Sequence, residues 1–220
     1  KSRSLSPVAF AVLQDNLARL KQRRVANNEQ ALENGSISEG ETAKIHKEIG
    51  SDIADVQRAF DDVLEIYRSE IKSDTLHLAS VRRAFAGFLA KYGGGADEQE
   101  KAVSLYQQAL SSYFAISGSK SESSLTTLLE FGKYRFDRAE LEEAWPLVEK
   151  YVETVESAYG PKHLWILPGL RFLASLKLTA NMESDARRIV DRIAEITGQP
   201  EPLDNKIVDI SGRSKDSIIT

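Results

Sequence analysis

Apolar residues along this chain return every three or four positions, which is the spacing of one face of an α-helix. Ser6-Pro7 is typical of a helix start, with a capping serine before a proline in the first turn. Leu13, Leu17 and Leu20 then form an apolar stripe, and Asn34-Gly35 is a stop signal. The pattern therefore predicts a helix over about residues 7–34.

A second long helix follows the short connection at 35–38. Ser38 with Glu41 forms a capping box. The apolar stripe of this helix is Ile45, Ile49, Ile53, Val56, Phe60, Val63, Tyr67 and Ile71. Residues 1–28 carry a net charge of +5 and residues 29–70 a net charge of -7. We predict an antiparallel pair, to which each exposed ion pair adds only ~0–1 kcal/mol.

Small residues recur at a fixed interval further along the chain. Two columns each advance in steps of 42 residues: Ala90, Gly132 and Ala174, then Ala102, Ala144 and Ala186. Bulky residues keep the same register: Leu89, Phe131 and Leu173, then Tyr106, Val148 and Val190. Such a period indicates stacked helical hairpins, in which a small side chain lets a neighbouring helix approach closely.

Turn signals fall between the expected helices of each hairpin. Gly93-Gly94-Gly95 divides the first hairpin. We expect capping by Asp97 with Glu100, Asp137 with Glu140, and Asn181 in the three successive hairpins.

These columns resemble the tetratricopeptide repeat (TPR), and the 42-residue period is similar to the longer kinesin-light-chain-type variant. The resemblance covers about residues 76–198 and implies an all-α fold, a right-handed α-solenoid of TPR-like hairpins preceded by a long antiparallel helix pair. We expect an N-terminal hairpin over 1–74 that caps the stack and three repeats over 76–117, 119–159 and 161–198. Residues 199–220 are expected to be a linker or tail.

The resemblance implies that the first helices of the repeats line a concave groove that binds a peptide or protein segment. By position, the expected groove residues are Lys91, Lys133, Arg171, Leu129 and Arg135. The cations favour an acidic ligand, and Leu129 would supply an apolar contact. The alternative for these cations is a solvated helix face without a ligand.

Two other roles stay open at this point. The first is a structural module that forms homo-oligomers through the amphipathic N-terminal hairpin. The second is an accessory domain that holds a small ligand between this hairpin and the first repeat, which would require an enclosed apolar pocket with convergent polar groups.

Composition narrows the classes of function. The net charge is -4 and the pI about 5.6, which argues against nucleic acid as a partner. The absence of cysteine excludes disulfides, thiolate metal sites and thiol nucleophiles. The three histidines lack metal-ligand spacing, and no phosphate loop or serine elbow occurs. We therefore expect neither an enzyme nor a cofactor, and no apolar run reaches the ~20 residues of a membrane span.

The end of the chain changes character after Gly198. Gln199-Pro200-Glu201-Pro202 reads as an extended linker, and residues 206–210 and 218–220 could form short strands. The first residue is Lys1 rather than Met. We expect a segment of a longer protein, and its compartment, cytoplasmic or exported with a trimmed leader, stays open.

Overall fold

The computed structural model describes residues 6–34, 38–200 and 203, and every regular element within these residues is helical. The α-helices are α1 (Pro7–Glu33), α2 (Glu39–Ile66), α3 (Leu76–Tyr92), α4 (Ala96–Ser117), α5 (Glu122–Asp137), α6 (Leu141–Tyr159), α7 (Leu167–Thr179) and α8 (Glu183–Thr197). A π-helical turn, η1 (Tyr67–Ile71), extends α2, and a 3-10 turn, η2 (Leu164–Ile166), precedes α7. The strands considered at 206–210 and 218–220 lie outside the described residues.

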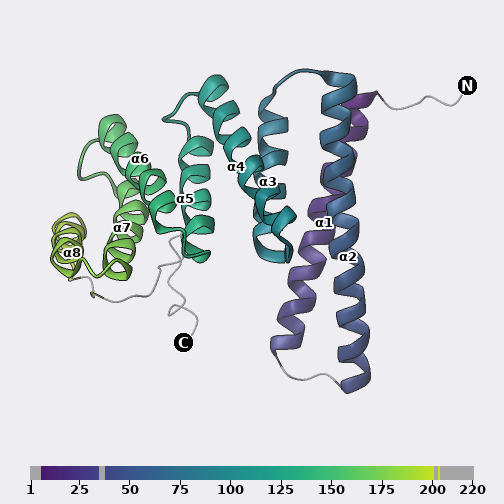
Figure 1. The fold of residues 1–220 in the computed structure, drawn as a ribbon, viewed down its shortest axis with the longest axis horizontal. Coiled ribbons are helices and arrows are strands. Elements are labelled where there is room, and N and C mark those ends of the chain that lie inside the picture. Colours follow the sequence, from purple (N-terminus) through teal and green to yellow (C-terminus); the bar gives the residue numbers. More distant parts are fainter. Residues whose placement is uncertain (1–5, 35–37, 201–202, 204–220) are drawn as a thin grey trace, which may run out of the picture. The chain divides into compact units, whose positions relative to one another are not determined.

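The chain divides into two compact units, residues 1–112 and 113–220. In the first unit, α1 and α2 form the predicted antiparallel pair (Figure 1). Lys21 pairs with Asp55 and Arg24 with Asp52, so the numbering rises along one helix while it falls along the other. Asp52 is 1% exposed, and its carboxylate is the buried partner of this network.

Both predicted start signals of the hairpin are confirmed. The Ser6 hydroxyl accepts a hydrogen bond from the Ala9 amide, and Ser38 with Glu41 forms the reciprocal capping box. In the second half of α2, the apolar stripe is buried around Phe60, whose ring stacks on Phe85 of α3 with centroids 4.9 Å apart.

The leucine stripe of α1 points away from the core. Leu13, Leu17 and Leu20 are 55%, 43% and 62% exposed. The buried residues of α1 are instead Ala11, Asp15, Ala18 and Val25. Because these side chains are small, α1 can approach its neighbours closely through this face. The larger apolar residues are left on the outside.

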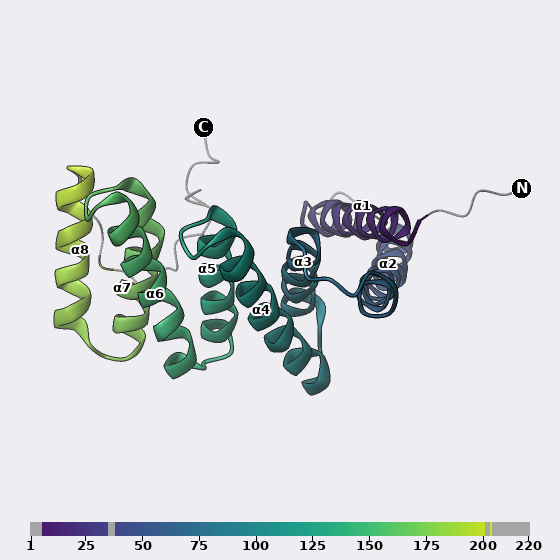
Figure 2. The same ribbon diagram turned by 90° about the horizontal axis from the view of Figure 1, so that it is seen from above.

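In the second unit, α5 to α8 follow one another as two antiparallel hairpins (Figure 2). The small-residue columns are buried here, as the period predicts. Ala144 and Ala186 are 0% exposed and Ala174 is 6% exposed. A Cβ atom on Gly132 would lie 2.9 Å from Val148 Cγ2, so any side chain at this position would require Val148 or α6 to shift.

The hairpin of α3 and α4, which corresponds to the first predicted repeat, departs from the 42-residue register. Ala90 is exposed, so its predicted packing role is wrong, whereas Ala86 is 0% exposed. The first helices of the hairpins end at Tyr92, Asp137 and Thr179, which are 45 and 42 residues apart.

The turns inside the hairpins explain this change of register. Ala139 and Asn181 occupy equivalent left-handed positions, with φ of 61° and 58°. The turn through Gly93 has no left-handed residue. The first hairpin therefore closes with a different backbone geometry, which shifts its packing positions along the first helix.

Two of the predicted caps are also wrong. The N-cap residue before α6 is Glu140 and that before α8 is Met182, and neither side chain makes a capping hydrogen bond. At the start of α4, the capping carboxylate belongs to Glu98, which accepts hydrogen bonds from the amides of Gly94 and Gly95 at 2.8 and 3.1 Å.

Candidate functional site

In the first unit, α1 lies along the face of α3 that carries Lys91. Three contacts define this arrangement: Asp15 with His77 at 3.4 Å, Arg19 with Ser80 at 3.4 Å, and Glu29 with Lys91 at 2.6 Å. The numbering rises together along both helices, so α1 and α3 run in parallel, and Figure 2 shows α1 beside α3. The α3 part of the predicted ligand face therefore already contacts this chain's own first helix.

The Lys91 ammonium group is held by this contact. Its Nζ atom donates to Glu29 and lies 4.8 Å from the centre of the Tyr92 ring. Partial burial by itself would lower the pKa of Lys91, but the hydrogen bonds with Glu29 and Tyr92 outweigh it and raise the pKa. A carboxylate ligand at Lys91 would have to compete with Glu29.

In the second unit, α5 and α7 run in the same direction because α6 returns between them. The rings of Phe136 and Phe172 meet edge to face with centroids 5.7 Å apart. A Cβ atom on Gly132 would lie 3.4 Å from the same Phe172 ring. Successive helical residues are about 100° apart. Lys133 follows Gly132 and Arg171 precedes Phe172, so the two cations turn toward the same side of the helix pair.

Lys133 and Arg171 keep part of their surface exposed, whereas Leu129 does not. The Lys133 side chain is 41% exposed and pairs with Asp137 on its own helix at 2.7 Å. Arg171 is half-buried. Leu129 is 4% exposed and packs in the core, which leaves a ligand almost no surface to contact.

Arg135 stabilises the turn at the end of α5. Its side chain is 17% exposed, pairs with Glu140 and lies 5.3 Å from the centre of the Phe131 ring. Partial burial by itself would raise the pKa of Glu140, but hydrogen bonds from Arg135 and Arg138 outweigh it and lower the pKa. Arg135 is thus engaged in closing the turn between α5 and α6.

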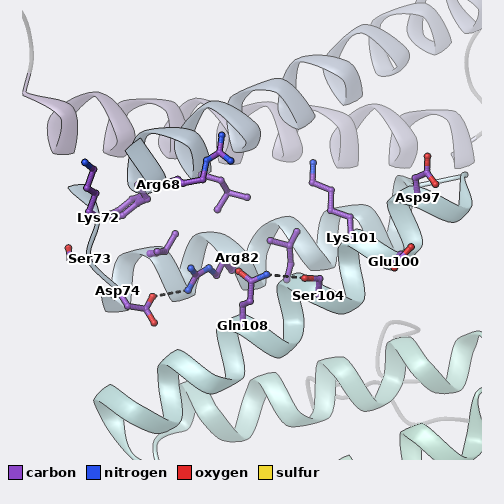
Figure 3. Close-up of a pocket in the computed structure, with 14 residues that line it drawn as sticks. Arg68, Lys72, Ser73, Asp74, Arg82, Asp97, Glu100, Lys101, Ser104 and Gln108 are labelled. Carbon is purple, nitrogen blue, oxygen red and sulfur yellow. Dashed lines mark hydrogen bonds and ion pairs between the residues drawn. The ribbon is translucent and has the colours of Figure 1, made fainter. Parts of the chain in front are cut away.

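A pocket of about 820 Å³ opens in the first unit between α2, η1, α3 and α4 (Figure 3). Leu64, Leu78 and Leu105 supply its apolar lining. The charged residues around it are Arg68, Lys72, Asp74, Arg82, Asp97, Glu100 and Lys101. Arg68 and Lys72 lie at one end and Asp97 and Glu100 at the other, so charges of both signs line one hollow.

Much of this charge is already compensated within the chain. Arg82 pairs with Asp74 at 2.7 Å and donates to Ser112 at 3.0 Å. Lys101 pairs with Asp61 at 2.6 Å and lies 4.7 Å from the centre of the Phe85 ring. The small-ligand alternative considered from the sequence places its ligand here, between the N-terminal hairpin and the first repeat. The sequence identified none of the lining residues, because they come from four elements whose packing no local pattern specifies.

A series of linked polar side chains also crosses the first unit. Tyr67 Oη and His77 Nδ1 are 2.6 Å apart, and His77 Nε2 faces the buried Asp15 carboxylate at 3.4 Å. Arg19 donates to the same carboxylate at 3.0 and 3.1 Å. Because Tyr67 is only 5% exposed, we assign to this series of polar contacts the structural role of holding α1, η1 and α3 together.

Within the described residues, no group of three or more histidine, aspartate or glutamate side chains could hold a metal ion. None of the helices in this described part of the chain combines the length and the apolar character needed to span a bilayer.

No family model matches the chain, and no curated protein matches it in sequence. Solved structures do match its fold. TPR-like repeats of a kinesin light chain-like protein from P. anserina align with a TM-score of 0.60 at 17% identity, over 89% of this chain and 98% of theirs. A variant of that protein gives a TM-score of 0.59 at 18% identity, over 86% and 96%.

A third similar structure is BtubC (BKLC) from P. vanneervenii. It aligns with a TM-score of 0.50 at 14% identity, over 84% of this chain and 74% of that one. These likenesses confirm the predicted fold class. In fold, the chain is a TPR-like repeat protein, an all-α helical solenoid similar to the kinesin light chain-like repeats.

Proposed function

We propose that this chain is a protein-interaction scaffold that binds an acidic peptide or protein segment along α5 and α7. The observation that carries the proposal is the packing of Gly132 and Phe136 against Phe172, which turns Lys133 and Arg171 toward one side of two parallel helices. A ligand carboxylate on that side can meet both cations. The proposed role requires no catalytic chemistry.

The energetics of Lys133 support an acidic ligand. Its partner Asp137 is 50% exposed, and an exposed ion pair of this kind contributes only ~0–1 kcal/mol. A carboxylate that contacts Lys133 and Arg171 together can therefore replace Asp137 at little cost. Lys91 belongs to the other unit and is held by Glu29, so we give it no part in this primary site.

The test is capture of acidic peptides from a synthetic array by the full chain, followed by titration of the tightest peptide. Lys133→Glu should weaken binding at least tenfold, which is about 1.4 kcal/mol. Lys150→Glu is the matched control, because Lys150 is also exposed and also pairs with an acid on its own helix, Glu153. Equal affinities for wild type and Lys133→Glu would contradict the site.

The second candidate function is the structural one, in which the N-terminal hairpin forms homo-oligomers. The exposed leucine stripe of α1 specifically favours it. The two functions use different surfaces and are tested independently.

A further inference from the structure

The first helix carries an apolar stripe that no described residue of this chain covers. We call Phe10, Leu13, Leu17 and Leu20 the α1 stripe; their exposed fractions are 40%, 55%, 43% and 62%. The opposite face of α1 packs in the unit through small residues. Contiguous exposed apolar surface of this kind marks an interaction site.

The spacing of the stripe indicates what covers it. Its members are separated by three, four and three residues, which is the a/d pattern of a helix–helix seam. The stripe covers about 80° of the helix circumference, because successive residues are about 100° apart. A helix that lies in a membrane surface presents a broader apolar face with a strongly charged opposite face. Val8 and Val12 are also exposed, at 51% and 40%, and widen the apolar face near the start of α1. The opposite face of α1 is packed in the unit and is not a charged, solvated face, so a single partner helix fits this stripe better than a bilayer.

The residues beside the stripe indicate the partner and its direction. Gln14 and Asn16 flank the centre of the stripe, and Lys21 and Arg23 flank its C-terminal end. Arg24 continues the seam after Leu20, and Asp52 holds its guanidinium group. In a parallel pair of identical helices, Arg24 would face its own copy, and like charges that meet in a seam are destabilising.

An antiparallel pair avoids this conflict. Phe10 then packs against Leu20 of the second copy and Leu13 against Leu17, while uncharged Gln14 and Asn16 meet their own counterparts at the centre. The cations move to opposite ends of the seam. A two-fold arrangement of this kind uses the same surface on both chains, so it is self-complementary and closed.

We propose that the α1 stripe is a homodimer interface in which α1 pairs antiparallel with α1 of a second copy. This inference deepens the structural alternative above and does not depend on peptide binding at Lys133. A seam of four side chains from each copy is smaller than a standard interface, so we expect a weak dimer with a dissociation constant on the order of micromolar.

The first experiment is sedimentation of the full chain over a wide range of concentrations. Wild type should shift from monomer to dimer, and Leu13→Glu combined with Leu17→Glu should raise the dissociation constant at least tenfold. Both leucines are exposed, so circular dichroism of the double variant should match wild type. Leu164→Glu is the control, because Leu164 is 64% exposed and lies outside the stripe; it should leave the dimer intact.

The second experiment tests direction, and it is simple because the chain contains no cysteine. Under mild oxidation, a mixture of Leu13→Cys and Leu17→Cys chains should form the mixed disulfide dimer. Each variant alone should cross-link poorly. Efficient self-linking of Leu13→Cys would overturn the antiparallel arrangement.

Two further results would overturn the dimer itself. One is a monomer at every concentration, and the other is a dimer that the double glutamate variant does not weaken. Binding of the monomer to vesicles of phosphatidylcholine with phosphatidylserine, lost in the double variant, would reassign the stripe to a membrane surface. None of these results bears on capture of acidic peptides, so this inference and the primary proposed function fail separately.

Discussion

At the scale of single residues, glycine decides how closely the helices of the second unit approach. A Cβ atom on Gly169 would lie 2.5 Å from Tyr151 Cδ1 and 2.8 Å from Val152 Cγ2. Tyr151 is fixed in turn, because its hydroxyl donates to the Trp165 carbonyl oxygen and burial raises its pKa to about 12. The aromatic ring cannot move aside without losing this bond.

Gly169→Ala should therefore destabilise the protein by about 1–3 kcal/mol, because the added methyl group overpacks a fixed contact. Gly50→Ala is the matched control. Gly50 also lies in a helix, but a Cβ atom on it would have no neighbouring atom from another part of the chain within 4 Å. This change should stabilise by about 0.5–1 kcal/mol through the better helix propensity of alanine. Urea unfolding measures both, and equal effects of the two changes would contradict the packing explanation.

At the scale of the element, the start of α4 depends on one carboxylate. Glu98 accepts hydrogen bonds from the amides of Gly94 and Gly95, and Gln57 of α2 donates to it at 2.7 Å. The backbone hydrogen bond from Gly95 is the largest cause of a lowered Glu98 pKa, followed by the bonds from Gln57 and Gly94. The charged form is therefore preferred in the folded protein.

A lowered folded pKa has a definite sign for stability. The contribution of Glu98 is present above the ordinary pKa of a glutamate and is lost as the pH falls through the folded pKa. Glu98→Gln should lower the melting temperature at pH 7, and the difference from wild type should shrink steadily below about pH 4. Glu100→Gln, an exposed neighbour on α4, should change the melting temperature little at either pH. A difference for Glu98→Gln that stays constant with pH would argue against the cap.

At the scale of the whole molecule, the contacts divide the chain at residues 112 and 113, within the length of α4. Helical repeats contact chiefly their neighbours in sequence, so stability is local and one part can open without the other. The predicted division into a hairpin over 1–74 and three repeats stays a prediction.

Local stability leads to a prediction for hydrogen exchange. Gly169→Ala should accelerate amide exchange in α5 to α8 and leave protection in α1 and α2 nearly unchanged. Exchange followed by mass spectrometry of peptides from both units measures this directly. A uniform loss of protection in both units would show that the chain unfolds as a single cooperative body.

The sequence alone determined where the helices lie and which class of fold they form. Ser6 and Ser38 begin their helices as capping chemistry requires, and the spacing of Gly132, Ala144 and Ala174 indicates stacked hairpins. These features depend on local backbone preferences and on the periodic recurrence of small side chains, and both can be recognised in the sequence without knowledge of long-range contacts.

Only the tertiary structure decided which face of each helix is buried. A large apolar side chain favours burial, yet Leu13, Leu17 and Leu20 of α1 lie outside because small residues let the helix approach its neighbours more closely. Ala90 is exposed and does not pack between helices as expected, because the turn that follows its helix has a different backbone geometry. The ion-pair partners of the cations could not be predicted from the sequence either, because Glu29 reaches Lys91 only when α1 lies along α3. Contacts between residues distant in sequence depend on the packing of whole helices, which no local pattern specifies.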